Sequence, residues 1–265
     1  MLRIKVNSKL LEAGDKINLI IGVSTWIFFA NTFGSSSPFL QNYGNDFISF
    51  LILGLMFNSL FAYTLDGFRI STLLFLRGRI GSMGQHLSMY DYVKLCGIPV
   101  SVPILAWLID GYIETSITLL VYLIAGIIFG LNIGSGNYLV ALVGILIGLF
   151  AVAGIGLLSA SMITIAGAWK GIEPISWLVK LLVGLLAGVY FPTEALPDSL
   201  QLISLLLPHT YALKIARMAL LTGFGFESLI SEFLAVSLMS LILFPLGIIV
   251  YRYSIALIKI KTLVE

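Results

Sequence analysis

Long runs of apolar residues divide this chain into segments that match the thickness of a lipid bilayer. A helix that crosses the hydrocarbon core needs about 20 apolar residues, and runs of about this length recur along the chain. With 59% apolar and only 11% charged residues, 265 residues lack the polar surface that a water-soluble domain requires. The sequence therefore predicts an all-α integral membrane protein with a single transmembrane domain over residues 1–265.

Six of these runs qualify as membrane-spanning helices. Helix is favoured over strand because each run is long and unbroken, without the alternating polarity of membrane strands. The third span is expected within Val100–Ile133, and the most continuous apolar part of this range begins after Glu114. The other five expected spans are Ile17–Phe33, Phe47–Leu65, Tyr138–Ala166, Ile175–Phe191 and Phe233–Tyr251.

Basic residues in the connections give the expected orientation. With the N-terminus inside, all of the 15 lysines and arginines except Lys214 and Arg217 fall on the cytoplasmic side, as positive-inside loops require. We therefore expect a multi-pass protein of the cell membrane with both termini in the cytoplasm. Residues 1–16 place apolar and basic residues at helical spacing, which predicts an amphipathic helix that lies on membrane lipids.

Two connections are too long to be simple turns. The cytoplasmic one covers residues 66–99, and its stretch Gln85–Leu95 has no glycine or proline and is expected to form a short helix. The outer one covers residues 192–232 and contains two apolar pieces, Leu200–Leu207 and Tyr211–Leu221. Each piece is too short to span the bilayer, so we expect short interfacial or re-entrant helices before the last span.

Several common chemistries have no motif in this sequence. No G-x-x-x-x-G-K-[ST] loop is present, so we expect no nucleotide site and no cofactor on the chain itself. The two histidines, His86 and His209, fall on opposite sides of the expected topology, which argues against a metal site. A net charge of +2 without a basic run gives no indication of nucleic-acid binding. No nucleophile elbow appears either, so an enzyme is not expected.

Two carboxylates interrupt the third apolar run. Asp110 and Glu114 are four residues apart and therefore share one face of a helix. They either mark a substrate entrance at the cytoplasmic end of the span or contact a cationic substrate or a proton within it. The run after Glu114 is long enough to cross without them, which favours the entrance. Asn58, in the second span, is expected to hydrogen bond to another helix.

The outer loop carries an ordered set of residues that resembles a known family. A small residue, an aromatic and Phe-Pro leave the fifth span, then a Leu-Pro, a Pro-x-Thr-Tyr-Ala, an arginine and a glycine lead into the sixth. This order and spacing resemble the C-terminal signature of the type 2 class of ABC exporter permeases. The residues that carry the resemblance lie within Gly188–Gly223 and are Phe191, Pro192, Pro197, Pro208, Tyr211, Arg217 and Gly223.

The resemblance implies a permease subunit of an ABC transporter. Such a chain pairs with a second copy or a close relative, and each half docks a cytoplasmic ABC ATPase that binds ATP and Mg²⁺. It would export an amphipathic, lipid-linked or drug-like substrate. The stretch Gly84–Gly97 is similar to the coupling helix of the family, although the family's glutamate is missing. The implied coupling residues are Gln85, His86, Tyr90, Asp91 and Lys94.

Three other functions were compared with an exporter. A secondary transporter or channel without an ATPase partner predicts charged or broken helices near the membrane midplane, whereas these apolar runs are mostly uninterrupted. An intramembrane enzyme needs a nucleophile with a base, or paired acids, that face each other at depth, and none is evident. A purely structural anchor leaves the long outer loop without a purpose. The sequence therefore favours the exporter, with the secondary transporter or channel as the alternative.

Overall fold

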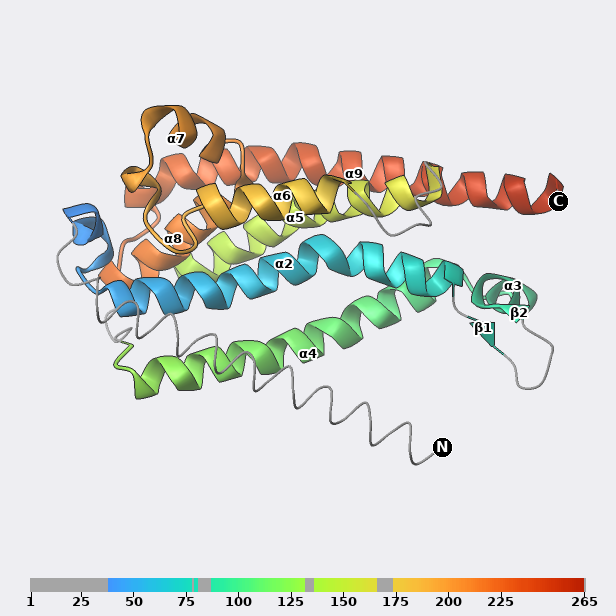
Figure 1. Ribbon diagram of the computed structural model, residues 1–265, viewed down its shortest axis with the longest axis horizontal. Helices are drawn as coiled ribbons and strands as arrows, with labels where there is room; N and C mark the ends of the chain where they lie inside the picture. Colours follow the sequence, from blue (N-terminus) through green and yellow to red (C-terminus); the bar gives the residue numbers. More distant parts are fainter. Residues whose placement is uncertain (1–37, 78, 81–86, 132–135, 166–173, 265) are drawn as a thin grey trace.

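The computed structural model describes residues 38–77, 79–80, 87–131, 136–165 and 174–264, and these form an elongated helical bundle (Figure 1). The only strands in this part of the chain, β1 and β2, are two residues each and pair antiparallel. The elements in chain order are η1 Pro38–Tyr43, α2 Phe47–Arg77, β1 Arg79–Ile80, β2 Leu87–Ser88, α3 Met89–Leu95, α4 Ser101–Ile128, α5 Tyr138–Ile165, α6 Pro174–Leu186, η2 Thr193–Ala195, α7 Asp198–Ser204, α8 Pro208–Thr222, η3 Glu227–Leu229 and α9 Ile230–Val264.

Four of the described helices are long and apolar enough to cross a membrane. They occupy Phe47–Leu76, Ser101–Ile128, Tyr138–Ile163 and Glu227–Leu257, and each overlaps one of the six expected spans. They give the chain the character of a multi-pass membrane protein. The expected first span, Ile17–Phe33, and the expected amphipathic helix over residues 1–16 lie outside the described residues.

The fifth expected span differs from the structure. The apolar run Ile175–Phe191 predicts a helix of spanning length, but α6 has 13 residues and ends at Leu186. The backbone turns at Gly188, whose φ of +78° belongs to the left-handed region that favours glycine. The apolar residues that follow α6 therefore form a turn instead of a further helical stretch.

The structure also moves the ends of two helices. α2 continues past Asp66 and Arg69 to Arg77, so the connection expected over residues 66–99 begins at residue 78. α4 runs from Ser101 to Ile128, so the third span lies within Val100–Ile133, as expected, and its helix includes Asp110 and Glu114. The short helix expected over Gln85–Leu95 is α3, and it starts at Met89, after β2.

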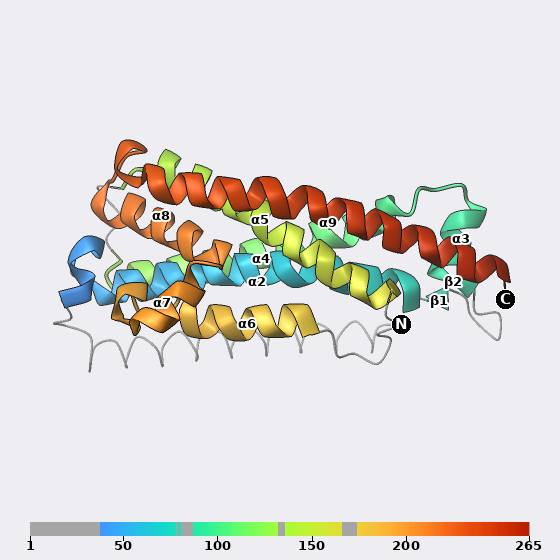
Figure 2. The same cartoon turned by 90° about the horizontal axis from the view of Figure 1, so that it is seen from above.

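α2 and α5 form the centre of the bundle, with α9 and α6 on either side of them in Figure 2. Glycines allow the closest approaches. A Cβ at Gly154 of α5 would lie 2.4 Å from the carbonyl carbon of Leu243 in α9, and a Cβ at Gly148 would lie 2.5 Å from the Cβ of Ala212 in α8. Small residues at such contacts let helix backbones pack directly.

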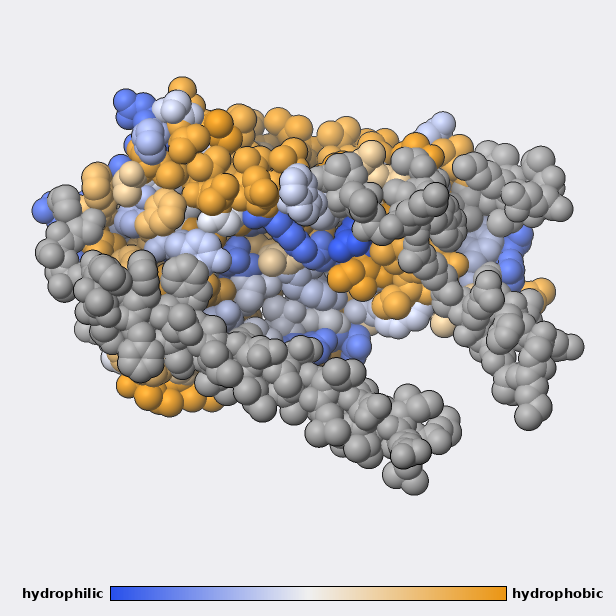
Figure 3. All heavy atoms as spheres, in the orientation of Figure 1, coloured by the Kyte–Doolittle hydropathy of each residue, from blue (hydrophilic) through white to orange (hydrophobic). Residues whose placement is uncertain are grey.

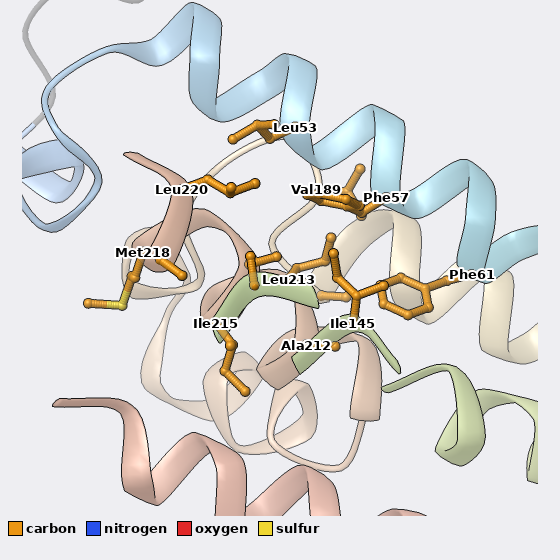
Figure 4. Close-up of a cluster of buried hydrophobic side chains, with 14 of the residues drawn as sticks. Leu53, Phe57, Phe61, Ile145, Val189, Ala212, Leu213, Ile215, Met218 and Leu220 are labelled. Atoms are coloured by element: carbon orange, nitrogen blue, oxygen red, sulfur yellow. The ribbon is translucent and has the colours of Figure 1, made fainter. Parts of the chain in front are cut away.

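α8 is inserted between the long helices at the η1 end of the bundle. Nearly all of its residues from Pro208 to Leu220 are buried, and Figure 4 shows its apolar side chains meeting those of α2 and α5. Leu213 and Ile215, for example, belong to the same buried cluster as Phe61 and Ile145. The expected piece Tyr211–Leu221 is thus part of a buried helix that begins three residues earlier.

Candidate functional site

Arg217 of α8 joins three parts of the η1 end. Its side chain is 2% exposed, and its Nε donates a hydrogen bond to the carbonyl oxygen of Phe50 in α2 at 3.0 Å. Nη2 donates to the carbonyl of Val189 at 2.6 Å, and Nη1 donates to the carbonyl of Gly188. Burial lowers the pKa of Arg217 to about 9, so the guanidinium keeps its charge at neutral pH. These contacts hold the turn after α6 against α2 and α8.

An aromatic ring and a glycine of α2 make room for the guanidinium of Arg217. The guanidinium carbon lies 3.6 Å from the centre of the Phe50 ring, in a cation–π contact. A Cβ at Gly54, one turn further along α2, would lie 1.7 Å from Nη2 of Arg217 and 2.4 Å from the carbonyl oxygen of Val189. Glycine is therefore required at position 54 for the guanidinium and the turn to reach α2.

The remaining signature residues build the path of the chain into α8. Pro192 and Pro197 precede η2 and α7, and Pro208 is the first residue of α8, a position where its missing N–H costs nothing. The hydroxyl of Tyr211 donates to the carbonyl oxygen of Leu205 at 3.1 Å. The two remaining signature residues lie at either end of this path. Phe191 is exposed on the turn after α6, and Gly223 ends α8 in the left-handed conformation with φ of +71°.

An ion-pair network ties four elements together at the same end. The Lys214 ammonium of α8 lies 3.1 Å from a carboxylate oxygen of Glu232 in α9 and 3.7 Å from one of Glu194 in η2. The hydroxyl of Tyr43 in η1 donates to Glu194 at 3.3 Å. Tyr43 is buried, but the side chains of Lys214, Glu194 and Glu232 are partly exposed, so these ion pairs fix the position of the loop more than they add stability.

A cavity of about 310 Å³ opens between α2, α6 and the start of α8. Its volume lies at the lower end of the range for small-molecule sites. Polar side chains reach it from four segments of the chain, and apolar residues fill the spaces between them. The lining consists of Asn58, Ala62 and Leu65 from α2, Lys180, Val183 and Gly184 from α6, Tyr190 from the turn, and His209 from α8.

Charged residues of α2 and α6 meet beside this cavity. The Lys180 ammonium pairs with one carboxylate oxygen of Asp66, and the other carboxylate oxygen lies 3.3 Å from Nη2 of Arg69, one turn along α2. Asp66 is mostly buried, whereas Lys180 is half exposed at 45%. In Figure 3, hydrophilic residues gather in the middle of this face, with apolar surface on both sides.

His209 lies in the second position of α8 and is buried, with 1% of its surface exposed. Its ring meets the Phe61 ring edge-on at 5.5 Å, and its Nδ1 has no hydrogen-bond partner. His209 lies in α8, which is not one of the four candidate spans. Burial lowers the pKa of His209 to about 3, so its imidazole is neutral at physiological pH.

The implied coupling residues have different positions at the α3 end. Tyr90 is 5% exposed and packs edge-on against Phe75 of α2 with ring centres 5.8 Å apart, so it anchors α3 and does not lie on its outer surface. Asp91 and Lys94 are exposed, as is Tyr92, a further aromatic residue of this helix. The two other implied coupling residues, Gln85 and His86, lie outside the described residues.

Asp110 and Glu114 lie near the middle of α4 and are exposed. Nine residues of α4 precede Asp110, and the placement of this pair at the cytoplasmic end of the span stays a prediction. Neither residue lines the cavity between α2, α6 and α8. The sequence reasoning that chose them missed Lys180, whose only sequence signal is a single basic residue within an apolar run.

In comparisons with known proteins, no family model, no curated protein and no solved structure matches this chain. The resemblance to type 2 ABC exporter permeases therefore stays a prediction carried by residues 188–223. What the structure adds is the set of contacts that holds those residues together, and a cavity with polar lining directly beside them.

Proposed function

We propose that this chain is the membrane-spanning permease subunit of an ATP-driven exporter. It forms the path for an amphipathic, lipid-linked or drug-like substrate, and a separate cytoplasmic ABC ATPase binds ATP and Mg²⁺ and drives transport. The subunit works as a pair with a second copy or a close relative in the cell membrane, with both termini in the cytoplasm. The chain itself performs no catalysis.

The contacts of Arg217 carry this proposal. The residues of the signature are spread over 36 positions, and the resemblance rests on their order and spacing. In the structure, Arg217 binds Gly188, where the signature starts, while Pro208 begins and Gly223 ends the helix that carries Arg217. Residues that resemble a family signature thus act as one structural unit, which is the behaviour expected of a signature that preserves a fold feature.

The attachment of α3 supports the proposed coupling. Tyr90 and Val93 are buried with Phe75 of α2 and Ile104 of α4 in one apolar cluster, and Tyr251 of α9 packs against it. A push on α3 therefore reaches the ends of three candidate spans through direct packing. Transport driven by a separate ATPase needs such a rigid connection between the docking surface and the spans.

The proposal is tested by isolating the tagged chain from its native membrane in a mild detergent. Co-purification of a chain with an ABC nucleotide-binding motif, together with ATPase activity in the preparation, is the expected result. A stable preparation without a nucleotide-binding partner and without ATPase activity would contradict the proposal.

A matched pair of variants locates the docking surface. Tyr92→Ala removes an exposed aromatic side chain from α3, whereas Tyr138→Ala makes the same change on an exposed tyrosine at the opposite end of the bundle. Aromatic side chains at the centre of an interface commonly contribute 2 kcal/mol or more, roughly thirtyfold in affinity. We expect Tyr92→Ala to reduce the co-purified ATPase strongly and Tyr138→Ala to leave it unchanged. Equal yields from both variants would place the ATPase elsewhere.

A secondary transporter or channel is the second candidate, favoured by one observation. The charged residues Asp66 and Lys180 meet within helices beside a cavity, and ionisable residues in such places often belong to ion or substrate paths. Transport that continues in vesicles without ATP, and stops when an ion gradient is removed, would support this candidate over the exporter.

A further inference from the structure

The cavity between α2, α6 and α8 is lined by hydrogen-bond donors. Lys180 offers an ammonium group, Asn58 an amide, Tyr190 a hydroxyl and His209 an imidazole. Among the described residues that line it, none is acidic. A cavity that presents donors from four segments and no carboxylate in its wall is suited to an acceptor-rich ligand.

The charges beside the cavity leave a surplus of one positive charge. Asp66 is shared between Lys180 and Arg69, so two cations surround one carboxylate. The carboxylate is mostly buried, whereas the Lys180 side chain is 45% exposed and lines the cavity. An anion in the cavity would therefore meet an ammonium group that a single shared carboxylate neutralises only in part.

The start of α8 adds a second attraction for negative charge. The first turn of this 15-residue helix contains no acidic residue, and its N-cap, Leu207, supplies no side-chain hydrogen bond. Helix N-termini carry a partial positive charge that attracts anions. In α8 this attraction comes from the dipole, because Pro208 has no N–H and the N–H of Thr210 donates to the carbonyl oxygen of Leu207 at 3.1 Å. His209, in the same turn, lines the cavity and is 1% exposed, and its Nδ1 has no hydrogen-bond partner within the described part of the chain. A buried polar group without a partner costs free energy that a ligand would recover.

The other walls of the cavity are apolar. Ala62, Leu65 and Val183 contribute hydrocarbon surface, and a Cβ placed at Gly184 would meet no atom within 4 Å. On the surface of α6 next to the cavity, Leu181 and Leu185 are exposed, so apolar surface continues outward from it. This combination suits a ligand with an anionic head and an apolar body.

We propose that this cavity binds a phosphate-bearing headgroup, contacted by Lys180, His209 and the N-terminus of α8. The inference rests on the proposed function, since it names the substrate class as amphipathic molecules with a phosphate group. The phosphate belongs either to a lipid headgroup or to a free soluble phosphate. In both cases the recognition is a charge-assisted hydrogen bond from an ammonium group with support from a helix N-terminus.

Binding is measured on the full chain, purified in an uncharged detergent, by fluorescence anisotropy of a labelled short-chain phosphatidic acid. The reference probe is a diacylglycerol with the same chains and label, which lacks only the phosphate. We expect the phosphatidic acid to bind at least about tenfold more tightly. Equal affinity for the two probes would overturn the proposal.

Two variants test whether the cavity is the site. Lys180→Gln removes the ammonium group, and Gly184→Leu fills the space that the glycine leaves open. We expect each to weaken phosphatidic acid binding by about tenfold. The matched controls are Lys94→Gln, which removes an exposed lysine on α3, and Gly184→Ala, which adds one methyl group; both are expected to keep at least half of the affinity. Equal losses in Lys180→Gln and Lys94→Gln would reveal unspecific attraction and overturn the assignment.

Competition with inorganic phosphate distinguishes the two sources. Displacement of the labelled lipid by millimolar phosphate would identify free phosphate as sufficient, whereas retention would show that the apolar body is required; either outcome supports the site. The assay needs no ATPase, so its failure is distinct from failure of the exporter proposal. If a preparation that contains a co-purified ATPase binds phosphatidic acid no more tightly than the diacylglycerol, this inference is refuted and the exporter proposal is not.

Discussion

Replacing Arg217 with methionine should destabilise the η1 end of the bundle more than any other single charge removal there. The variant keeps a long apolar side chain but loses three hydrogen bonds, to Phe50, Gly188 and Val189. Hydrogen bonds that involve a charged group contribute about 1.5–3 kcal/mol each. The buried guanidinium also carries a desolvation cost that the variant recovers. The net loss for breaking a buried charged contact is therefore expected at about 3–5 kcal/mol.

The control removes a charge from the same helix. Lys214→Met breaks the ion pairs with Glu194 and Glu232, but the Lys214 side chain is 30% exposed, and exposed pairs contribute about 0–1 kcal/mol. Free energies of unfolding are measured for both variants by titration with dodecyl sulfate in mixed micelles, with proteolysis of the turn after α6 as a second readout. An Arg217→Met protein within about 1 kcal/mol of the wild type, with a turn that stays protected, would refute the role given to this arginine.

The same contact can be disturbed from its other side. Gly54→Ala places a methyl group where Nη2 of Arg217 and the carbonyl of Val189 now lie, and overpacking of this kind costs about 1–3 kcal/mol. Because both substitutions act on one contact, the double variant should lose less than the sum of the two single losses. Additive losses would mean that the glycine and the arginine contribute independently.

Two further predictions concern ionisable residues. Because burial keeps the pKa of His209 low, the folded state holds a neutral imidazole, and stability is lost as the pH falls from 6.5 toward 3, by about 2 kcal/mol at pH 5. His209→Phe should therefore lose less stability between pH 7 and pH 5 than the wild type. Equal losses would contradict the assignment. The double variant Asp110→Asn and Glu114→Gln changes exposed residues outside the cavity, so ATPase turnover of the assembled complex should stay within about twofold, and a tenfold loss would place these carboxylates on the transport path.

Hydropathy predicted the existence of the long helices better than their ends. The second span was expected to stop at Leu65 because charged residues follow, yet α2 continues through Asp66 and Arg69. Those two residues pair with each other one turn apart, and Asp66 also pairs with Lys180, so the charges are compensated inside the bundle. Apolar content reports where lipid can surround a helix, whereas the helix itself ends only where its backbone hydrogen bonding stops.

The opposite error occurred after Leu186. The residues from Ala187 to Phe191 are as apolar as a span, and Ala187 and Val189 are indeed buried, but they form a turn. Burial behind Arg217 makes an apolar turn stable, because the guanidinium satisfies the carbonyls that the turn exposes. Sequence periodicity contains no sign of this, since the arginine that satisfies these carbonyls lies 28 residues further along the chain.

The cavity residues were accessible to sequence reasoning only one at a time. Asn58 was expected to hydrogen bond to another helix, and His209 was considered only as one of two histidines that do not form a metal site. Nothing in the spacing of Asn58, Lys180 and His209 joins them. They come from helices that only the tertiary fold brings together. The outer-loop residues could be grouped from the sequence because they are close together along the chain and occur in a fixed order.

The position of α8 explains why the connection over residues 192–232 is long. This helix of 15 residues is about 22 Å long at 1.5 Å per residue, too short to cross a bilayer. Its second residue, His209, contacts Phe61, which lies fourteen residues into α2, or about 21 Å from the start of that helix. The N-terminus of α8 is therefore located deep within the bundle, where unsatisfied backbone and side-chain donors are costly unless protein or ligand binds them. The cavity and Lys180 lie at that point. The loop therefore places the N-terminus of α8, with its partial positive charge, where a phosphate group can bind to it.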